Sequence, residues 1–248
     1  MFKNPDVLWL STNPYLMRFN LPIIKCLSHH FAIGHWEYEQ KPDEGCSLDI
    51  AIALLDDYLT MIKKPVHLIG HSTGGLLGLL YARQHPEKVR SLTLLGVGVN
   101  PEIDWISYYY DLRTNLPCSR EIVLGSMAKL LFSYQNHYYQ RAFVQILSKA
   151  VSFSLSPHSL YQKKEILKGG ITQPLMVCGS VQDAIVTSSQ IQQWQPYLKK
   201  EDSISKLSEG GHFFHYHSPQ TVGKEISKFL KPISANQESK INSPLPSS

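Results

Sequence analysis

Hydrophobic residues in this chain follow two patterns, which alternate from one end of the sequence to the other. Short apolar runs predict six β-strands, at residues 7–10, 31–37, 65–69, 89–97, 174–179 and 203–207. Between them, apolar residues recur at every third or fourth position, which predicts helices at 22–29, 47–63, 76–84, 188–197 and 219–230. This alternation favours the α/β class, with a doubly wound, mostly parallel sheet of about six strands.

The segment 47–63 carries the clearest helical pattern. Its apolar positions are spaced three or four residues apart: Leu48, Ile52, Leu55, Leu59 and Ile62. Ser47 stands just before them and suits an N-cap, because its hydroxyl can accept a hydrogen bond from a free N–H of the first turn. The next run, 65–69, is apolar without interruption, which is typical of a central strand buried on both faces.

The alternation stops between residues 100 and 170, where the sequence predicts helices and no strand. We therefore expect residues 1–99 and 171–231 to form one α/β core, interrupted by a helical cap at 100–170. Residues 232–248 are rich in Ser, Asn and Pro, and we predict that they form a disordered tail.

Composition narrows the classes of ligand. The chain has 248 residues and a formal net charge of +4, with its lysines and arginines scattered, so we predict no nucleic-acid partner. Its four cysteines lie far apart and include no Cys-x-x-Cys pair, so we predict no metal site. The sequence shows neither a Gly-rich dinucleotide fingerprint nor a P-loop lysine, and we expect no cofactor.

Targeting signals are also missing from the sequence. No apolar stretch typical of a signal peptide follows Lys3, and no apolar run is long enough to span a bilayer. We therefore predict a cytoplasmic protein with no integral membrane segment.

The most informative motif is Gly-His-Ser-Thr-Gly at 70–74, between the strand at 65–69 and the helix at 76–84. Gly-x-Ser-x-Gly in this context predicts a sharp strand-to-helix turn with the serine hydroxyl at its apex. Such a turn is so tight that Gly70 and Gly74 must lack side chains. The helix N-terminus beside Ser72 favours negative charge. The motif therefore predicts a nucleophilic serine.

A nucleophilic serine needs a base within hydrogen-bond reach and an acid that orients the base. In folds that carry Gly-x-Ser-x-Gly, these partners follow in the order Ser, Asp or Glu, His, each after a strand. Here Asp183 follows the strand at 174–179, and His212 follows the strand at 203–207. Three residues in the required order, each behind a predicted strand, indicate a Ser-Asp-His triad.

These features together resemble the α/β-hydrolase superfamily of the serine-nucleophile type with a helical cap. The matching segments are Gly-His-Ser-Thr-Gly-Gly at 70–75, Gly179 to Asp183 with the following Ala-Ile-Val, and Gly-Gly-His at 210–212 with Ser-Pro at 218–219. The resemblance implies that Ser72 is the nucleophile, His212 the general acid and base, and Asp183 its orienting carboxylate. Four rival residues remain open, two for the base and two for the acid: His215, His217, Asp104 and Asp111.

The resemblance also implies an oxyanion hole built from two backbone N–H groups. One would come from Thr73, directly after the nucleophile. The other usually comes from a His-Gly loop after the first central strand, where this chain has Ser-Thr-Asn at 11–13. We expect Asn13, or alternatively Thr12, to supply that N–H. The loss of the glycine restricts the backbone there, although a main-chain donor does not require one.

The cap should lie over the carboxyl edge of the sheet, next to Ser72. Trp105, Tyr108 and Tyr109 are therefore candidates for the wall of an apolar substrate pocket. We expect most of the other aromatic residues of the cap to pack within the cap itself. We expect a serine hydrolase of the carboxylesterase kind, which cleaves an ester or thioester of a medium-sized apolar small molecule through an acyl-enzyme. Two alternatives stay open: C–C hydrolysis, elimination or acyl transfer on the same fold, and a non-enzymatic ligand binder.

Overall fold

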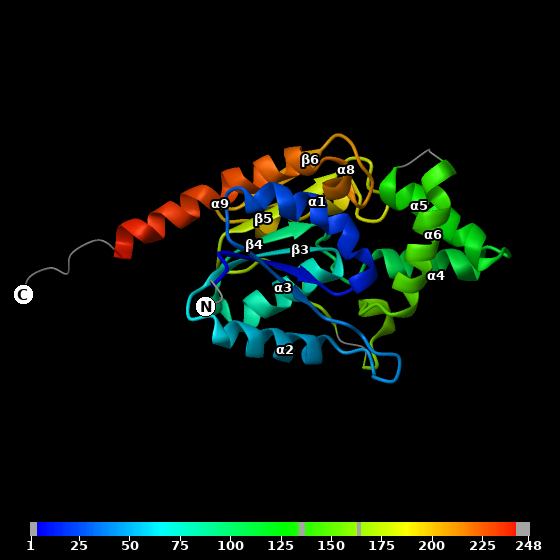
Figure 1. The fold of residues 1–248 in the computed structure, drawn as a ribbon, viewed down its shortest axis with the longest axis horizontal. Helices are drawn as coiled ribbons and strands as arrows, with labels where there is room; N and C mark the ends of the chain where they lie inside the picture. The colour runs from blue at the N-terminus through cyan, green and yellow to red at the C-terminus, as the bar shows by residue number, and fades with distance from the viewer. Residues whose placement is uncertain (1–3, 134–136, 163–164, 242–248) are drawn as a thin grey trace, which may run out of the picture.

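The computed structural model describes residues 4–133, 137–162 and 165–241, and its centre is one six-stranded sheet (Figure 1). The strands are β1 (Val7–Ser11), β2 (Ile33–Glu37), β3 (Val66–His71), β4 (Val89–Leu95), β5 (Leu175–Ser180) and β6 (Ser203–Leu207). They lie in the order β2-β1-β3-β4-β5-β6, and every neighbouring pair is parallel. The α/β class and the number of strands predicted from the sequence are confirmed.

Helices cover both faces of this sheet. The helices α1 (Met17–Ser28), α8 (Phe214–His217) and α9 (Pro219–Ile241) lie over one face, and α2 (Leu48–Met61) and α3 (Thr73–Gln84) lie under the other (Figure 1). The short helix α7 (Ser188–Gln192) follows β5. Alternate residues of β1 point to opposite faces, as the pleat requires: Val7 and Trp9 pack with α1 and α9, whereas Leu8 and Leu10 pack with α2 and α3.

Helix α1 begins five residues earlier than the sequence predicts, because Pro22 lies inside it rather than at its start. Its buried apolar residues, Phe19, Ile23 and Leu27, follow one another at intervals of four and hold the helix against the sheet. The free energy gained by burying these side chains exceeds the cost of the one backbone hydrogen bond that the proline cannot donate. A 3₁₀ turn at Pro14–Leu16 precedes the helix.

Helix α9 differs from the expectation at its other end. The sequence predicts a disordered tail from residue 232, whereas the helix continues through Pro232 to Ile241. Beyond the proline, the Ser234 hydroxyl bonds the buried His67 ring at 3.1 Å and the Leu230 carbonyl at 3.2 Å. These contacts attach the turn after Pro232 to the core. Residues 242–248, the rest of the predicted tail, lie outside the described residues.

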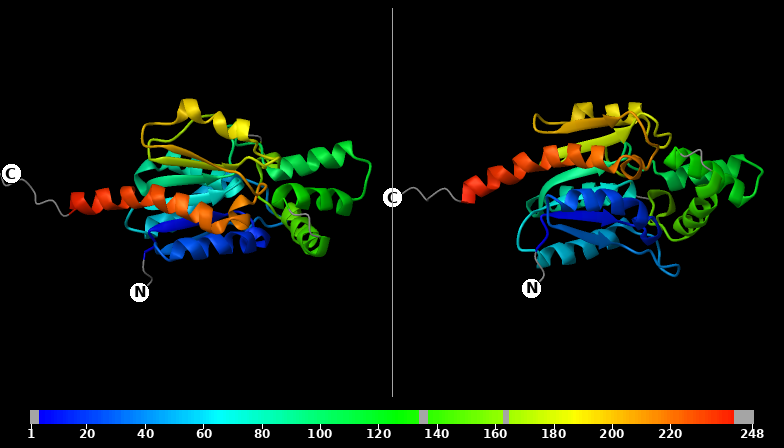
Figure 2. Two further views of the ribbon diagram at one scale, coloured as in Figure 1. Left: turned by 90° about the horizontal axis from the view of Figure 1, so that it is seen from above. Right: turned by 45° about the horizontal axis from the view of Figure 1, so that its top comes forward.

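Within the described residues, three α-helices lie between β4 and β5 along the chain, α4 (Trp105–Asn115), α5 (Arg120–Phe132) and α6 (His137–Ser152), and a 3₁₀ turn at Pro157–Ser159 follows them. We call these three helices the cap. Figure 2 shows them together at the end of the molecule opposite the free end of α9. They lie beside the carboxyl ends of the strands, since the residue after His212, Phe213, donates its N–H to Leu131 of α5 at 2.9 Å. Within the described residues, no helix is both long and apolar enough to cross a membrane.

Candidate active site

Ser72 is the single residue between β3 and α3, and its backbone is strained. Its φ is 51° and its ψ is −126°, a conformation that residues with side chains seldom adopt. A Cβ on Gly70 would lie 2.5 Å from the carbonyl carbon of Gly74, and one on Gly74 would lie 2.5 Å from the Leu10 carbonyl oxygen. Both distances are far below van der Waals contact, so the turn requires glycine at these two positions.

Asp183 and His212 meet at the carboxyl ends of β5 and β6. The His212 Nδ1 lies 2.9 Å from the Asp183 Oδ2, and both side chains are completely buried. The other carboxylate oxygen accepts the backbone N–H groups of Ile185 at 2.8 Å and Val186 at 3.0 Å. These bonds fix the carboxylate in its own loop, so the imidazole is oriented by an acid that cannot rotate away from it.

Two polar atoms of the site, one on Ser72 and one on His212, make no hydrogen bond to the described residues. The Ser72 Oγ and the His212 Nε2 are both buried, and neither has a hydrogen-bond partner among the described residues. A buried polar atom without a partner is costly, so such atoms concentrate where a ligand or a reacting group completes them. Because Nδ1 bonds the aspartate, Nε2 is the nitrogen that can exchange a proton.

The rival residues are exposed or have other hydrogen-bond partners. His215 is buried, but its Nε2 bonds the Asn20 Oδ1 at 2.9 Å, and burial lowers its pKa to about 3. His217 is exposed and lies 3.7 Å from Glu209. Asp111 is exposed on α4, and Asp104 is the N-cap of that helix. Of these candidates, the geometry pairs only His212 with a buried carboxylate.

His71, the residue before Ser72, is a member of the site that the sequence analysis did not identify. Its Nε2 lies 2.9 Å from the backbone carbonyl of His212, and the two rings are 4.6 Å apart. Burial, and after it the nearby His215 and His212, hold the pKa of His71 well below its ordinary value. A neutral ring that bonds a carbonyl must donate from Nε2, so His71 holds the His212 backbone in place. Its position beside the nucleophile was the available signal.

The two predicted oxyanion donors border the same space as the serine. Thr73 is the first residue of α3, where backbone N–H groups have no partner within the helix. Asn13 follows β1 and caps the 3₁₀ turn, its Oδ1 accepting the N–H of Tyr15 at 3.0 Å. Asn13, Thr73 and Ser72 all line one cavity, and the alternative donor, Thr12, lines it as well.

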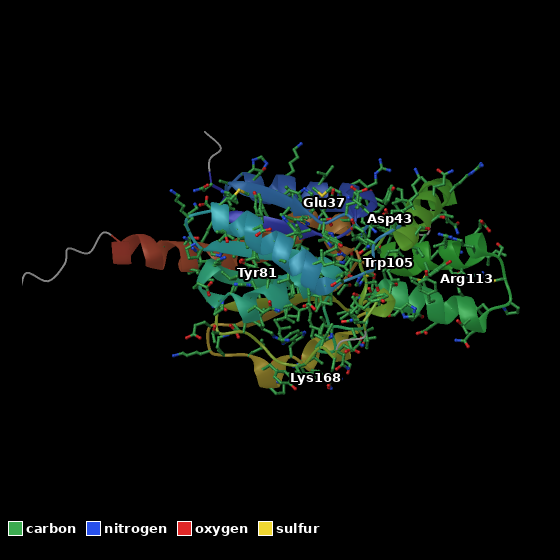
Figure 3. All side chains as sticks on the ribbon, turned by 90° about the horizontal axis from the view of Figure 1, so that it is seen from below. Glu37, Asp43, Tyr81, Trp105, Arg113 and Lys168 are labelled. Carbon is green, nitrogen blue, oxygen red and sulfur yellow. The ribbon has the colours of Figure 1, made fainter. Side chains whose placement is uncertain are left out.

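That cavity holds about 30 Å³, room for one or two water molecules. Four apolar side chains from the cap and the loops close it on one side: Trp105, Ile106, Leu155 and Phe213. Figure 3 shows Trp105 where the cap meets the core, with Arg113 far out at the other end of α4. The predicted pocket residues Tyr108 and Tyr109 do not line this cavity, because α4 turns away from the site after Ile106. Tyr109 is buried among apolar side chains instead.

In the part of the chain that the structure describes, no three His, Cys, Asp or Glu side chains are arranged so that they could hold a metal ion. The four cysteines are all free thiols. Serine, histidine and aspartate are the groups that the geometry brings together at this site.

Comparisons with known proteins support the fold. A family model described as alpha/beta hydrolase fold matches residues 59–127, which include the Ser72 turn. An uncharacterized protein of Nostoc sp. is 40% identical over 229 residues and covers 92% of each chain. The structure is similar to a serine hydrolase of Cycloclasticus zankles, with a TM-score of 0.69, 17% identity and coverage of 92% of this chain and 90% of the other.

A third similar protein is a meta-cleavage product hydrolase of Pseudomonas fluorescens, solved as a serine-to-alanine mutant complexed with acetates. Its TM-score is 0.68, its identity is 12%, and the match covers 91% of this chain and 90% of the other. At such low identities, these two structures support the fold and do not indicate a substrate.

Proposed function

Because the chain belongs to the α/β-hydrolase superfamily, we propose that it is a serine hydrolase that cleaves an ester or thioester through an acyl-enzyme. The observation that carries the proposal is the buried 2.9 Å contact between Asp183 and His212 beside a serine on a strained turn. A core that needed only packing would not bury these polar groups, since each costs free energy unless it is paired.

The first half of the reaction forms the acyl-enzyme. The Ser72 Oγ attacks the acyl carbon of the substrate while the His212 Nε2 takes the hydroxyl proton. The carbonyl oxygen becomes an oxyanion, which the N–H groups of Thr73 and Asn13 stabilise. Asp183 accepts a hydrogen bond from Nδ1 and stabilises the imidazolium. The intermediate collapses, His212 gives its proton to the leaving alcohol or thiol, and the acyl group stays on Ser72.

The second half returns the free enzyme. His212 takes a proton from a water molecule, whose oxygen attacks the acyl carbon of the acyl-enzyme. A second oxyanion forms in the same hole and collapses with release of the acid. The proton held on Nε2 returns to the Ser72 oxygen, and the triad is restored without any cofactor.

Part of the cavity wall is apolar, which supports an apolar substrate. Trp105, Leu155 and Phe213 face the cavity beside Ser72. Its volume of about 30 Å³ is nevertheless far below the several hundred cubic ångströms that small-molecule sites usually need. We therefore propose that the cap side of the wall moves away when the substrate enters and returns before the chemistry.

The experiment that tests this proposal is covalent labelling with a fluorophosphonate. We expect one label per chain, on Ser72, and no label on Ser72→Ala. Purified protein would then be offered p-nitrophenyl esters of increasing acyl length, a thioester and a meta-cleavage substrate, with the products identified by mass spectrometry. Absence of labelling at high probe excess would contradict the proposal. Labelling combined with C–C cleavage alone would keep the nucleophile and change the reaction.

A further inference from the structure

Both residues that carry the proposed oxyanion donors are connected to one stretch of the cap. This stretch is the segment 150–156, which ends α6 and leads back toward the core. It is hydrogen-bonded directly to the Asn13 side chain and, through the buried carboxylate of Asp104, to the Thr73 hydroxyl. The sequence separations are 137 residues or more for the first connection, so no local motif predicts it.

The first connection is made by the Asn13 side chain. Its amide nitrogen donates to the Ala150 carbonyl at 3.0 Å and to the Ser154 hydroxyl. That hydroxyl in turn donates to the Ala150 carbonyl at 2.6 Å. Since the Oδ1 of the same amide accepts the Tyr15 N–H, Asn13 is held from both ends of its side chain. Asn13 is 4% exposed, so water cannot readily replace these partners.

The second connection passes through Asp104, which is fully buried. Its Oδ2 accepts the Ser156 hydroxyl at 2.7 Å and the Thr73 hydroxyl at 3.3 Å. Its Oδ1 accepts the N–H of Ser107 at 2.8 Å, which caps α4. Asp104 therefore joins three segments: the start of α3, the start of the cap and its end. Burial raises the pKa of this carboxyl, and the hydrogen bonds oppose that effect.

From these two connections we infer that the segment 150–156 positions the oxyanion hole, with Asn13, Ser154, Asp104 and Ser156 as positioning residues. This inference rests on the proposed function. The cavity beside Ser72 must widen to admit a substrate, and Leu155, in the middle of the segment, is part of its wall. When the segment moves out, both connections break. When it returns, both donor residues are fixed together, so closure over the substrate and assembly of the hole become one event.

The consequence is an oxyanion hole that is fully organised only while the segment 150–156 is closed over the cavity. Donors that are aimed before the reaction stabilise the transition state more than the ground state. Loss of the connections should therefore lower kcat more than it raises KM. A segment that merely packed against the core, or that only bound substrate, would not give this split.

The test compares alanine variants at Ser154 and Ser156 with a matched control at Ser152. The Ser152 hydroxyl lies on the exposed side of α6 and bonds the Ser148 carbonyl and Arg120, not the oxyanion loops. For Ser154→Ala and Ser156→Ala we expect kcat to fall about tenfold or more, a fraction of the effect of losing a whole donor, with KM changed less than about threefold. Ser152→Ala should keep both constants.

Four further variants separate an effect on the position of the donors from an effect on folding. Ser154→Thr and Ser156→Thr keep the hydroxyl and should restore most of kcat. Asn13→Ala leaves the backbone N–H in place and removes the side-chain amide with all its bonds, so it should lower kcat at least as much as Ser154→Ala. The Asn13→Ala and Ser154→Ala double variant should be little worse than Asn13→Ala alone, because that substitution already removes the bond to Ser154.

The outcomes distinguish this inference from the function on which it rests. If the wild-type protein neither labels nor hydrolyses esters, the proposed function fails. If the wild-type protein is active and the alanine variants match it, the function stands and the inference is overturned. A rise in KM at unchanged kcat would also overturn it, since the segment would then contribute to binding alone.

Discussion

The two sides of the candidate site are built in different ways. On the core side, the Ser72 turn and the Asp183 loop are fixed by backbone geometry within a few residues: two glycines that admit no Cβ, and a carboxylate bonded by two N–H groups of its own loop. On the cap side, the Asn13 loop is fixed by side chains that are distant in sequence. The core side is thus prebuilt, whereas the cap side depends on closure.

The largest expected effect on activity comes from removing the Ser72 hydroxyl, the proposed nucleophile on the core side of the site. Ser72→Ala should lower kcat for ester hydrolysis by about 10⁴-fold or more, because loss of a triad nucleophile leaves only the contributions of binding and the oxyanion hole. Steady-state hydrolysis of a p-nitrophenyl ester measures it. The matched control is His217→Gln, an exposed histidine that should retain activity. If Ser72→Ala kept a tenth of the activity, the nucleophile would have to be another residue.

The next prediction concerns the turn itself. Gly74→Ala places a Cβ 2.5 Å from the Leu10 carbonyl oxygen, a clash with backbone on the central sheet. We expect it to lower the free energy of unfolding by about 3 kcal/mol or more, at the upper end of overpacking effects. Gly98→Ala is the control. Its Cβ would lie 3.4 Å from a Val186 side-chain carbon and 3.8 Å from the Asn100 carbonyl oxygen, which are ordinary van der Waals distances. Urea unfolding followed by circular dichroism compares the two; equal losses would contradict the geometry of the turn.

Three buried histidines, His67, His71 and His215, have pKa values lowered by burial and make stability depend on pH. Burial, as the largest cause, lowers the pKa of His67 and of His215 from 6.5 to about 3. Below pH 6.5 the unfolded chain binds protons that the folded chain does not, so stability is lost as the pH falls toward 3. Each histidine contributes up to about 1.4 kcal/mol per pH unit.

Urea unfolding between about pH 7 and pH 4 measures this dependence. His67→Asn should reduce the slope of the unfolding free energy against pH by up to about 1.4 kcal/mol per pH unit, because it removes the buried imidazole. An unchanged slope for His67→Asn would mean that this histidine titrates normally in the folded protein.

The smallest expected effect is on the free energy of unfolding. It comes from two helix-cap variants that test whether the core and the cap unfold separately. Ser47 caps α2 of the core and Ser119 caps α5 of the cap, each with its hydroxyl accepting a backbone N–H at 3.4 Å. Alanine at either position should cost about 1 kcal/mol. Apolar residues of α5 and α2 belong to one buried cluster, so both variants should shift a single unfolding transition. A separate, earlier transition in Ser119→Ala would show that the cap unfolds independently.

Much of the core side was predictable from the sequence. The apolar runs indicated all six strands, and the order of Ser72, Asp183 and His212 behind their strands predicted which residues the structure brings to one edge of the sheet. Each of these predictions depends on short segments and on the rule that parallel strands share a carboxyl edge. The boundaries were less accurate: α1 starts before Pro22 and α9 continues past Pro232, because tertiary packing outweighs the local preference of proline.

The cap side was less predictable. The sequence placed Tyr108 and Tyr109 in the pocket, but α4 turns both away from the cavity, and helical spacing alone could not say where that helix would dock. It also did not identify His71 as the residue that holds the His212 backbone. Both features depend on which side chains face each other after folding.

By itself, then, the sequence determined the α/β fold and the strained turn of Ser72, since these follow from local periodicity and from the sterics of two glycines. Tertiary structure alone decided how the cavity closes and how Asn13 and Thr73 are held by the segment 150–156. Those arrangements depend on hydrogen bonds between side chains far apart in the chain, whose partners no local pattern specifies.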